Sequence, residues 1–486
     1  MVFVNRQTEL NWLEEVYRSG RAQLLVLYGR RRVGKTELLR FFCREKKHVF
    51  FVADLAPDRE QLAAFSQRLW ERAYGQAETG FSFPSWEAAF RFMGGLARQE
   101  QLIVVLDEFP YLMETNPSIP SILQKVWDEE LRNTRILCIL CGSYVGVMER
   151  EVLGYKSALY GRRTGQYLIE PLHFHDIAGF FPGRGSVWLV EAYAVLGGVP
   201  AYLLEFMDED DLFAGIARRV LRRGTFLYEE PRFLLMQELR EPANYFAVLR
   251  AIAHGKTRLN EITQAAGLHD RSATSRYLDI LRDMGLIQRL VPVTEKQPQK
   301  SRRGIYRLRD QFLRFWFRFV YPNRSELEEG EAERVLETRI KPHFPDFVGP
   351  VFEEVCRQHL RFLGQRGKLP FYPYRLGSWW DGQNELDLLA INEDESAILV
   401  GECKWWGKPV GANVLSELQQ KVKAVVPHFQ RPPQVYYALF ARNGFSEELH
   451  QMAAERHDLL LIEACQFQSR NNHSILNQNP GITSDR

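Results

Sequence analysis

The amino-acid sequence predicts an α/β protein of several domains, and three patterns along its 486 residues indicate this class. Apolar runs alternate with amphipathic stretches over residues 1–170, which is typical of β/α units around a parallel sheet. Residues 243–309 follow a helix-helix-helix-strand-strand order, and another α/β unit spans about 345–465. A chain of this length exceeds what one hydrophobic core usually organises, so about three domains are expected.

The composition is that of an ordinary soluble globular chain, with 45% hydrophobic and 26% charged residues. Lys and Arg total 63 against 61 Asp and Glu, so the formal net charge of +2 gives no indication about nucleic acid. The N-terminus lacks a basic-then-apolar leader, and no apolar run reaches the roughly 18 residues of a membrane helix. We therefore expect a cytoplasmic protein that does not bind membranes.

A phosphate-binding loop is predicted between the apolar strand "LLVLY" and the helix "ELLRFFCRE". The intervening "GRRRVGKT" matches G-x-x-x-x-G-K-[ST], whose glycines let backbone N–H groups surround phosphates at a helix N-terminus. Lys35 would reach the β- and γ-phosphates of ATP, and Thr36 would hold Mg²⁺. The residues predicted to bind the nucleotide are Gly29, Arg30, Arg31, Arg32, Val33, Gly34, Lys35 and Thr36.

An acidic pair ends the strand "LIVVLDE", about 70 residues after the loop. We expect Asp107 to complete the Mg²⁺ shell and Glu108 to orient and deprotonate the attacking water. A simple loop start is the ordinary explanation of such a pair. The order of the motifs and the gap between them favour the catalytic interpretation.

These motifs resemble those of the archaeal-type ATPase family, a branch of the AAA+-like and STAND P-loop ATPases. The resemblance extends to "FVNRQTELNWL", where Phe3, Arg6 and Glu9 match the N-terminal nucleotide-side box, and to "LGGVPAYL". It covers roughly the first 205 residues. It implies an ATPase core over 1–170 and a helical lid over 171–240.

The same resemblance implies three further site residues and an assembly state. Ser143 ends the strand next to the catalytic one, where the family has a polar sensor. The pair Arg162 and Arg163 in "LYGRRTG" stands at a γ-phosphate-sensing position, although a solvated basic turn explains it equally well. AAA+-like sites often lie between subunits, so the resemblance implies a homo-oligomer.

Residues 241–310 have the order of a winged-helix domain. Asp270 can cap the third helix, and the strands "LIQRLVPV" and "GIYRLRD" would form the wing. The start of the third helix and the wing tip are suited to contacts with DNA bases and phosphates. The alternative is an internal clamp that senses nucleotide. The residues predicted to contact DNA are Arg271, Ser272, Arg276, Lys300, Arg302 and Arg303, with Thr274, Ser275 and Lys296 beside them.

A connector over 311–344 begins with the aromatic stretch "QFLRFWFRFVYP" and continues into the charged segment "NRSELEEGEAER", which is expected to be exposed. Residues 345–467 are predicted to form a second α/β domain. Strand alternation places Glu385, Asp387 and Leu389 on one face, and a hairpin would bring Asp387 to Glu402. Two carboxylates with water suit Mg²⁺ or Mn²⁺. Lys404 could activate water or stabilise charge on a phosphate.

The spacing Asp-x14-Glu-x-Lys and the α-β-β-β-α-β order resemble the PD-(D/E)XK nucleases, which have the restriction-endonuclease-like fold, and also DUF234 over roughly 310–465. The preceding helix carries Glu353 and Glu354, and Glu354 is predicted as a further metal ligand. Leu386 stands where the nuclease motif has proline. An exposed pair at a strand end is the ordinary explanation of Glu402 and Lys404. The polar tail 468–486 is expected to be disordered.

The sequence thus predicts a Mg²⁺-dependent ATPase with a helical lid, joined through a winged helix to a metal-dependent nuclease that acts on DNA rather than RNA. The alternative is a STAND-like ATP switch whose winged helix and degenerate nuclease-like domain only bind nucleic acid or a protein partner. A weaker possibility is a DNA-binding regulator that uses ATP to control occupancy.

Overall fold

The computed structural model describes residues 4–76, 78, 80–239 and 241–467. The chain divides into two compact units, one of Met1–Pro171 with Asp279–Gly285 and the other of Leu172–Leu278 with Leu286–Arg486. Phe3 and the tail 468–486 lie outside the described residues. Among the described residues, no helix has the length and hydropathy required to cross a membrane.

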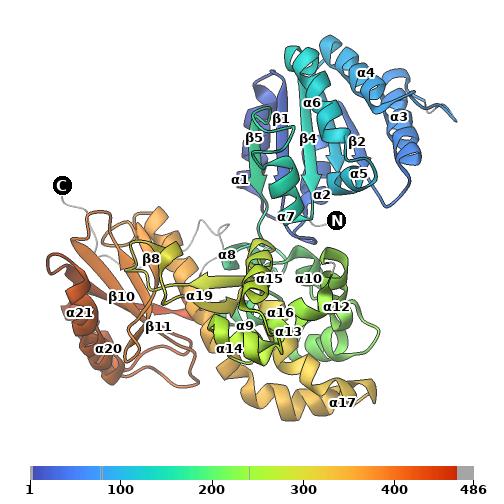
Figure 1. Cartoon of the computed structure of the whole chain (residues 1–486). Helices are drawn as coiled ribbons and strands as arrows, with labels where there is room; N and C mark the ends of the chain where they lie inside the picture. Colours follow the sequence, from blue (N-terminus) through green and yellow to red (C-terminus); the bar gives the residue numbers. More distant parts are fainter. Residues whose placement is uncertain (1–3, 77, 79, 240, 468–486) are drawn as a thin grey trace. The chain divides into compact units, whose positions relative to one another are not determined.

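The first unit is built on a five-stranded parallel sheet with the order β2-β3-β4-β1-β5 (Figure 1). Its strands are β1 (Gln23–Tyr28), β2 (His48–Val52), β3 (Leu102–Asp107), β4 (Ile136–Gly142) and β5 (Gly165–Leu168). Its helices are α1 (Gln7–Arg18), α2 (Lys35–Cys43), α3 (Asp58–Tyr74), α4 (Trp86–Gln99), α5 (Phe109–Thr115), α6 (Ile119–Glu129) and α7 (Val145–Val147), with a π-helical turn at Met148–Val152.

Helices cover both faces of this sheet, which explains why its strands read as continuous apolar runs. Leu24 and Val26 of β1 pack into a core with α3, α4 and α6. Leu25 and Leu27 point to the other face and pack with α1 and α2. The predicted parallel sheet is therefore confirmed.

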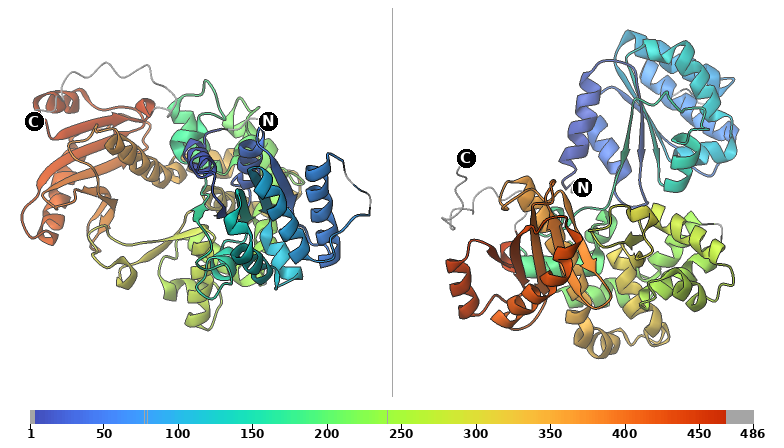
Figure 2. Two further views of the ribbon diagram at one scale, coloured as in Figure 1. Left: turned by 90° about the horizontal axis from the view of Figure 1, so that it is seen from above. Right: turned by 60° about the vertical axis from the view of Figure 1, so that its left-hand side comes forward.

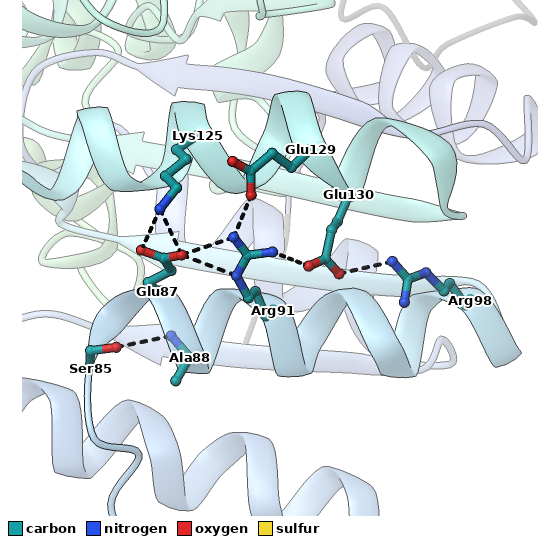
Figure 3. Close-up of polar contacts among 8 residues, drawn as sticks. All are labelled: Ser85, Glu87, Ala88, Arg91, Arg98, Lys125, Glu129 and Glu130. Atoms are coloured by element: carbon teal, nitrogen blue, oxygen red, sulfur yellow. Dashed lines mark hydrogen bonds and ion pairs between the residues drawn. The ribbon is translucent and has the colours of Figure 1, made fainter.

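A surface ion network ties α4 to α6 (Figure 3). The Arg91 guanidinium contacts Glu87 on its own helix, and Glu129 and Glu130 at the end of α6. The Lys125 ammonium on α6 lies 3.0 Å from the Glu87 carboxylate. Each pair is solvent-screened and weak by itself, so the network mainly fixes the relative placement of the two helices.

The second unit begins with short helices and continues with three helices and a two-stranded antiparallel sheet. The first group comprises α8 (Phe174–Ile177), α9 (Ser186–Leu196), α10 (Pro200–Leu204), α11 (Leu212–Gly215), a π-helical segment (Ile216–Leu221) and α12 (Phe226–Glu238). The second comprises α13 (Pro242–Ala253), α14 (Leu259–Ala265), α15 (Arg271–Asp283), β6 (Ile287–Leu290) and β7 (Ile305–Leu308). Asp270 caps α15 as expected, accepting from the N–H of Ser272 at 2.8 Å and of Ala273 at 3.2 Å.

The connector predicted at 311–344 is helical, and its aromatic and charged parts differ in burial. Phe312, Phe315 and Trp316 are buried, and the Trp316 indole N–H donates to the carbonyl of Tyr228 in α12 at 2.8 Å. The charged segment 323–334 is exposed at most positions, as expected, whereas the apolar residues of the preceding aromatic stretch recur at helical spacing and face the core. Its elements are α16 (Gln311–Phe315), α17 (Arg324–Glu328) and α18 (Ala332–Val335), with π-helical turns at Trp316–Val320 and Leu336–Ile340 and 3-10 turns at Tyr321–Asn323 and Lys341–His343.

The C-terminal sheet has the order β12-β11-β10-β9-β8, with β8, β9 and β10 antiparallel and β10, β11 and β12 parallel. Helix α19 lies on one face, and α20 and α21 on the other (Figure 2). The elements are α19 (Phe344–Gln365), β8 (Arg375–Trp380), β9 (Glu385–Ile391), β10 (Ala397–Lys404), α20 (Ala412–Val425), β11 (Gln434–Ala441), α21 (Glu447–Glu455) and β12 (Leu459–Glu463). This second sheet, expected from the sequence, completes the α/β class.

Candidate nucleotide-binding and metal-binding sites

Residues 29–36 form the turn after β1 and the start of α2, at the carboxyl end of the parallel strands. The Lys35 ammonium lies inside this loop and donates to the carbonyls of Gly29 at 2.8 Å and Arg30 at 3.0 Å. Gly29 cannot be replaced without strain, because a Cβ there would lie 2.3 Å from the carbonyl oxygen of Ile169. The Lys35 ammonium is therefore held within the loop that the motif assigns to phosphate binding.

The two predicted Mg²⁺ ligands are in direct contact. The Thr36 hydroxyl donates to Asp107 Oδ2 at 2.6 Å, and Asp107 is only 1% exposed. Parallel strands bring their carboxyl ends to one edge of a sheet, so Thr36 in the first turn of α2, which follows β1, meets the last residue of β3 there. A hydroxyl and a carboxylate are oxygen donors of the kind that Mg²⁺ prefers.

Glu108 is held in an unusual backbone conformation beside this pair. Its φ is 51°, in the left-handed region that a residue with a side chain rarely adopts. Its carboxylate accepts from the Ser143 hydroxyl at 2.6 Å and from the Ser143 N–H at 3.3 Å. The structure therefore brings together Lys35, Thr36, Asp107, Glu108 and Ser143, all of which the sequence singled out.

Arg6 supports the loop from behind. Its buried guanidinium donates to the Val33 carbonyl at 2.9 Å, the Glu170 carbonyl at 2.8 Å and Glu9 at 2.9 Å. Arg6 thus contacts one carbonyl of the phosphate-binding loop and one from the segment that follows β5. The N-terminal box is a positioning element for the loop in this structure.

Arg31 makes contacts that sequence reasoning did not foresee. Its guanidinium donates to the Tyr111 hydroxyl at 2.6 Å and the Tyr144 hydroxyl at 3.2 Å. Both tyrosines follow residues predicted for the site, after β3 and β4. The sequence signal that could have found them is their position shortly after Glu108 and directly after Ser143.

The structure does not bring Arg162 and Arg163 to the loop of the same chain. Both precede β5, which runs parallel to β1, and the Thr164 N–H donates to the Leu24 carbonyl at 2.8 Å. They therefore lie where β1 begins, at the sheet edge opposite to the phosphate-binding loop. Arg162 pairs with Asp128 at 3.0 Å.

The C-terminal site centres on what we call the acidic cluster: Glu353, Asp387 and Glu402. Asp387 Oδ2 accepts from the Cys403 N–H at 2.9 Å. Burial, with the negative charges of Glu402 and Glu353, raises the pKa of Asp387 to about 8. The antiparallel register of β9 with β10 runs to Leu388 and Gly401, so the next residues, Asp387 and Glu402, are neighbours as predicted. Burial and the neighbouring negative charges both disfavour ionisation of Asp387.

A β-bulge places Asp387 in the cluster in a way that alternation did not predict. The register between β8 and β9 shifts between Gly377 and Trp379, and Leu386 and Leu389 both pack in the core with α20. Asp387 and Leu389 therefore do not share a face as expected. A bulge inserts a residue into one strand and redirects its side chains, and such bulges are frequent next to sites.

On α19 the acid that joins the cluster is Glu353 and not the predicted Glu354. Burial raises the pKa of Glu353, and Glu353 in turn raises that of Asp387. The Glu354 carboxylate is instead held by Arg357 and by the Gln358 amide at 3.1 Å. Consecutive helical residues point about 100° apart, so only one of the two can face the sheet.

Two lysines hold the Glu402 carboxylate, which is 3% exposed. Lys404 donates to Glu402 Oε2 at 2.6 Å, and Lys421 of α20, which sequence reasoning missed, contacts the other oxygen. Burial disfavours the charged form of Lys404, but Glu402 more than offsets this, so the pKa of Lys404 is raised. The exposed Trp406 lies beside it, with the Lys404 and Lys408 ammoniums 5.6 and 6.0 Å from its ring centroid.

The donors of the acidic cluster fit a divalent cation by chemistry, since all are carboxylate oxygens. They are not gathered into a ligand shell, because no group of three His, Cys, Asp or Glu within the described part of the chain is placed to hold a metal. The set predicted from the sequence, Asp387, Glu402 and Glu354, is therefore not assembled.

The residues predicted to contact DNA differ in accessibility. Thr274 is buried, and its hydroxyl donates to the Asp270 carbonyl at 3.0 Å, so it cannot contact a base. Arg303 pairs with Glu295 at 3.3 Å and is partly buried. The exposed members of the set are Arg271, Ser272, Arg276, Lys296, Lys300 and Arg302.

Two family models match the chain. Residues 3–206 match an ATPase domain described as predominantly from Archaea, and residues 316–417 match DUF234, described as archaeal and bacterial proteins of unknown function. The uncharacterized protein MJECL04 of Methanocaldococcus jannaschii is 35% identical over 410 residues, which cover 83% of this chain and 88% of that protein. The uncharacterized ATP-binding protein MJ0423 of the same organism is 51% identical over 47 residues, covering 10% of this chain and 80% of that protein.

Among solved structures, the Walker-type ATPase PABY2304 of Pyrococcus abyssi is similar with a TM-score of 0.48 and 23% identity, covering 65% of this chain and 96% of that one. The parallel sheet and its loop define a P-loop ATPase, followed by a second sheet domain. The chain belongs to the family of archaeal ATPases in which such a domain precedes DUF234. The predicted resemblance is confirmed.

Proposed function

We propose that the chain hydrolyses ATP with Mg²⁺ and that its C-terminal domain is a metal-dependent nuclease acting on DNA. The observation that carries the ATPase part is the hydrogen bond from Thr36 to Asp107 beside the Lys35 ammonium. The nuclease part rests on the acidic cluster, with Lys404 at the shared end of β9 and β10.

In the ATPase site, Mg²⁺ bound by Thr36 and Asp107 would neutralise charge on the β- and γ-phosphates. Glu108 would take the proton of the attacking water while the water oxygen bonds to the γ-phosphorus and the bond to the β–γ bridging oxygen breaks. Ser143 would keep the Glu108 carboxylate in place. Lys35 would offset the negative charge that develops on the β-phosphate of the departing ADP.

In the C-terminal site a divalent cation would supply positive charge to a phosphodiester and polarise water. Water would add to phosphorus as one P–O ester bond breaks, and the proton that the water loses balances the one that the departing oxygen gains. Lys404 keeps its proton because of Glu402, so we assign it to stabilising the charged phosphate. It is not assigned as the base.

The three helices α13–α15 with β6 and β7 would act as a winged helix that binds the DNA backbone through its exposed basic residues. We further propose that the ATPase acts as a homo-oligomer in the cytoplasm. Because Arg162 and Arg163 lie away from the loop of their own chain, any contact with a γ-phosphate would be to that of a neighbouring subunit.

Phosphate release from ATP tests the first activity. Lys35→Ala should abolish it, and unchanged turnover refutes the ATPase assignment. Single- and double-stranded DNA and RNA are then incubated with Mg²⁺ or Mn²⁺, with and without ATP. Cleavage by the wild type that is lost in Asp387→Ala and in Lys404→Ala supports the nuclease, and identical behaviour of all three proteins refutes it.

A second candidate is a STAND-like ATP switch whose C-terminal domain binds nucleic acid or a protein without cutting. Two observations favour it: lysines hold both oxygens of Glu402, and among the residues that the structure describes the carboxylates are not gathered into a metal shell. Leu386, which stands where the nuclease motif has proline, also favours a domain that does not cut. Metal-independent binding of DNA, with no cleavage under any condition, would establish this alternative.

A further inference from the structure

The hairpin formed by β6 and β7 is attached to the edge of the C-terminal sheet. The Val293 N–H donates to the Ser378 carbonyl in β8 at 3.0 Å, and the Arg375 guanidinium donates to the Val293 carbonyl at 3.4 Å. The Val293 side chain packs against the core of the same sheet. Because β8 is an edge strand, this pairing satisfies backbone groups that would otherwise be open. The hairpin is therefore fixed beside the C-terminal site.

Arg307 in β7 directs its charge into that site. Its guanidinium lies 3.8 Å from the carboxylate of Glu385, the first residue of β9. It also acts on Glu353: burial raises the pKa of Glu353, and the charge of Arg307 opposes that rise. Since Glu353 in turn interacts with Asp387, Arg307 belongs to the same electrostatic cluster although it comes from a different part of the sequence.

The ion pair of Arg307 is easily exchanged. Its two side chains are 42% and 56% exposed, and exposed pairs of this kind contribute about 0–1 kcal/mol. A phosphate offers the same guanidinium charge-assisted, often bidentate hydrogen bonds. Arg307 can thus leave Glu385 for a phosphate at little cost.

A nucleic-acid backbone would also need an available cationic side chain at the C-terminal site. The carboxyl groups of the acidic cluster offer a phosphodiester no positive charge, and Lys404 and Lys421 are both engaged with Glu402. The hairpin loop extends the positive charge, because Lys296, Lys300 and Arg302 are exposed. The hairpin loop lies close to the turn between β8 and β9. Backbone N–H groups of that turn lower the pKa of Asp381 within it, and the charge of Arg303 in the hairpin loop lowers this pKa further.

We infer that Arg307 is a phosphate-binding residue of the C-terminal site, and that the hairpin and the acidic cluster hold one nucleic-acid strand together. This inference rests on the proposed nuclease function and deepens it, since it makes the hairpin part of the substrate site. The hairpin is thus not a separate DNA reader.

The test measures binding of fluorescein-labelled single- and double-stranded DNA by anisotropy in EDTA, over a range of salt concentrations. Arg307→Glu should weaken binding by about tenfold and lower the slope of log K against log salt by about one, whereas Arg307→Lys should retain most of the affinity. Arg339→Glu, at an exposed position in the π-helical turn Leu336–Ile340, is the matched control and should bind within about twofold of the wild type.

Cleavage in Mg²⁺ is measured on the same proteins. Wild-type-like binding and cleavage by Arg307→Glu, with cleavage lost in Asp387→Ala, overturn the inference and leave the nuclease in place. A wild type that neither binds nor cuts refutes the proposed function and the role of Arg307 with it. If Arg307→Glu unfolds at a lower temperature than the control, the Arg307→Lys and Arg307→Ala pair decides, and equal affinities of those two count against the inference.

Discussion

Replacing Ser143 by alanine tests the ATPase site through one hydrogen bond. The Ser143 hydroxyl donates to Glu108 at 2.6 Å, and this contact fixes a carboxylate that the strained backbone at φ 51° places beside Asp107. A hydrogen bond to a charged group contributes about 1.5–3 kcal/mol. If all of it serves to position Glu108 in the transition state, Ser143→Ala should lower kcat by about 10- to 150-fold.

The KM for ATP should stay nearly constant, because the contacts of Lys35 and Thr36 are untouched. Steady-state phosphate release measures both constants. Ser143→Thr keeps a hydroxyl and should retain most of the activity, and Ser157→Ala, a serine whose hydroxyl caps its own turn, is the control.

A double-mutant cycle separates positioning from a general structural role. In the Glu108→Gln background, Ser143→Ala should have little further effect, because residues that act as one unit are not additive. If the two losses multiply, or if Ser143→Ala raises KM and leaves kcat alone, Ser143 does not act through Glu108.

Three further changes probe the two sites. Arg6→Ala should lower the free energy of unfolding by about 2–3 kcal/mol and weaken nucleotide binding, because it leaves two backbone carbonyls without their cationic donor. Denaturant titration compares it with Arg18→Ala, an exposed arginine at the other end of α1, and equal effects contradict the positioning role. Burial raises the pKa of Asp387 from 3.8 to about 8. The folded chain therefore keeps a proton that the unfolded chain loses above about pH 4. Without metal, the free energy of unfolding should fall by about 1.4 kcal/mol per pH unit between about pH 4 and pH 8. Asp387→Asn should remove this dependence in denaturation curves recorded in EDTA, and an unchanged slope would show that the carboxyl is already ionised in the folded state. Trp406→Ala should weaken the binding of single-stranded DNA about tenfold and that of double-stranded DNA less, because Trp406 is 40% exposed and its indole can stack on an unpaired base. Equal losses of affinity for both substrates would count against stacking.

Much of the ATPase domain follows from the sequence because its signals are local. Strands covered on both faces read as continuous apolar runs, so β1 and β3 were recognisable without their partners. The loop at Gly29–Thr36 and the pair Asp107–Glu108 sit at strand ends, and parallel strands bring such ends to one edge whatever the details of packing. Five predicted residues therefore meet in the structure.

The C-terminal site was predictable only in outline. The order of helices and strands and the meeting of Asp387 with Glu402 follow from spacing and a hairpin. The choice of Glu353 over Glu354 depends on the rotation of α19 against the sheet, which is set by packing along the whole helix. Lys421 and Arg307 come from other elements, and nothing in the local sequence marks either of them.

By itself the sequence determined the chemistry available to this protein: a phosphate-binding loop with its acidic partners, and two carboxylates and a lysine on neighbouring strands. The tertiary structure decided which of these groups meet. A bulge in β9 directs Asp387, the parallel pairing of β5 with β1 carries Arg162 and Arg163 away from the loop, and the pairing of Val293 with β8 sets Arg307 beside the acidic cluster. The physical reason is that each position of the sequence specifies its own side chain. Strand register, helix rotation and the pairing of edge strands instead depend on contacts with residues distant in the chain.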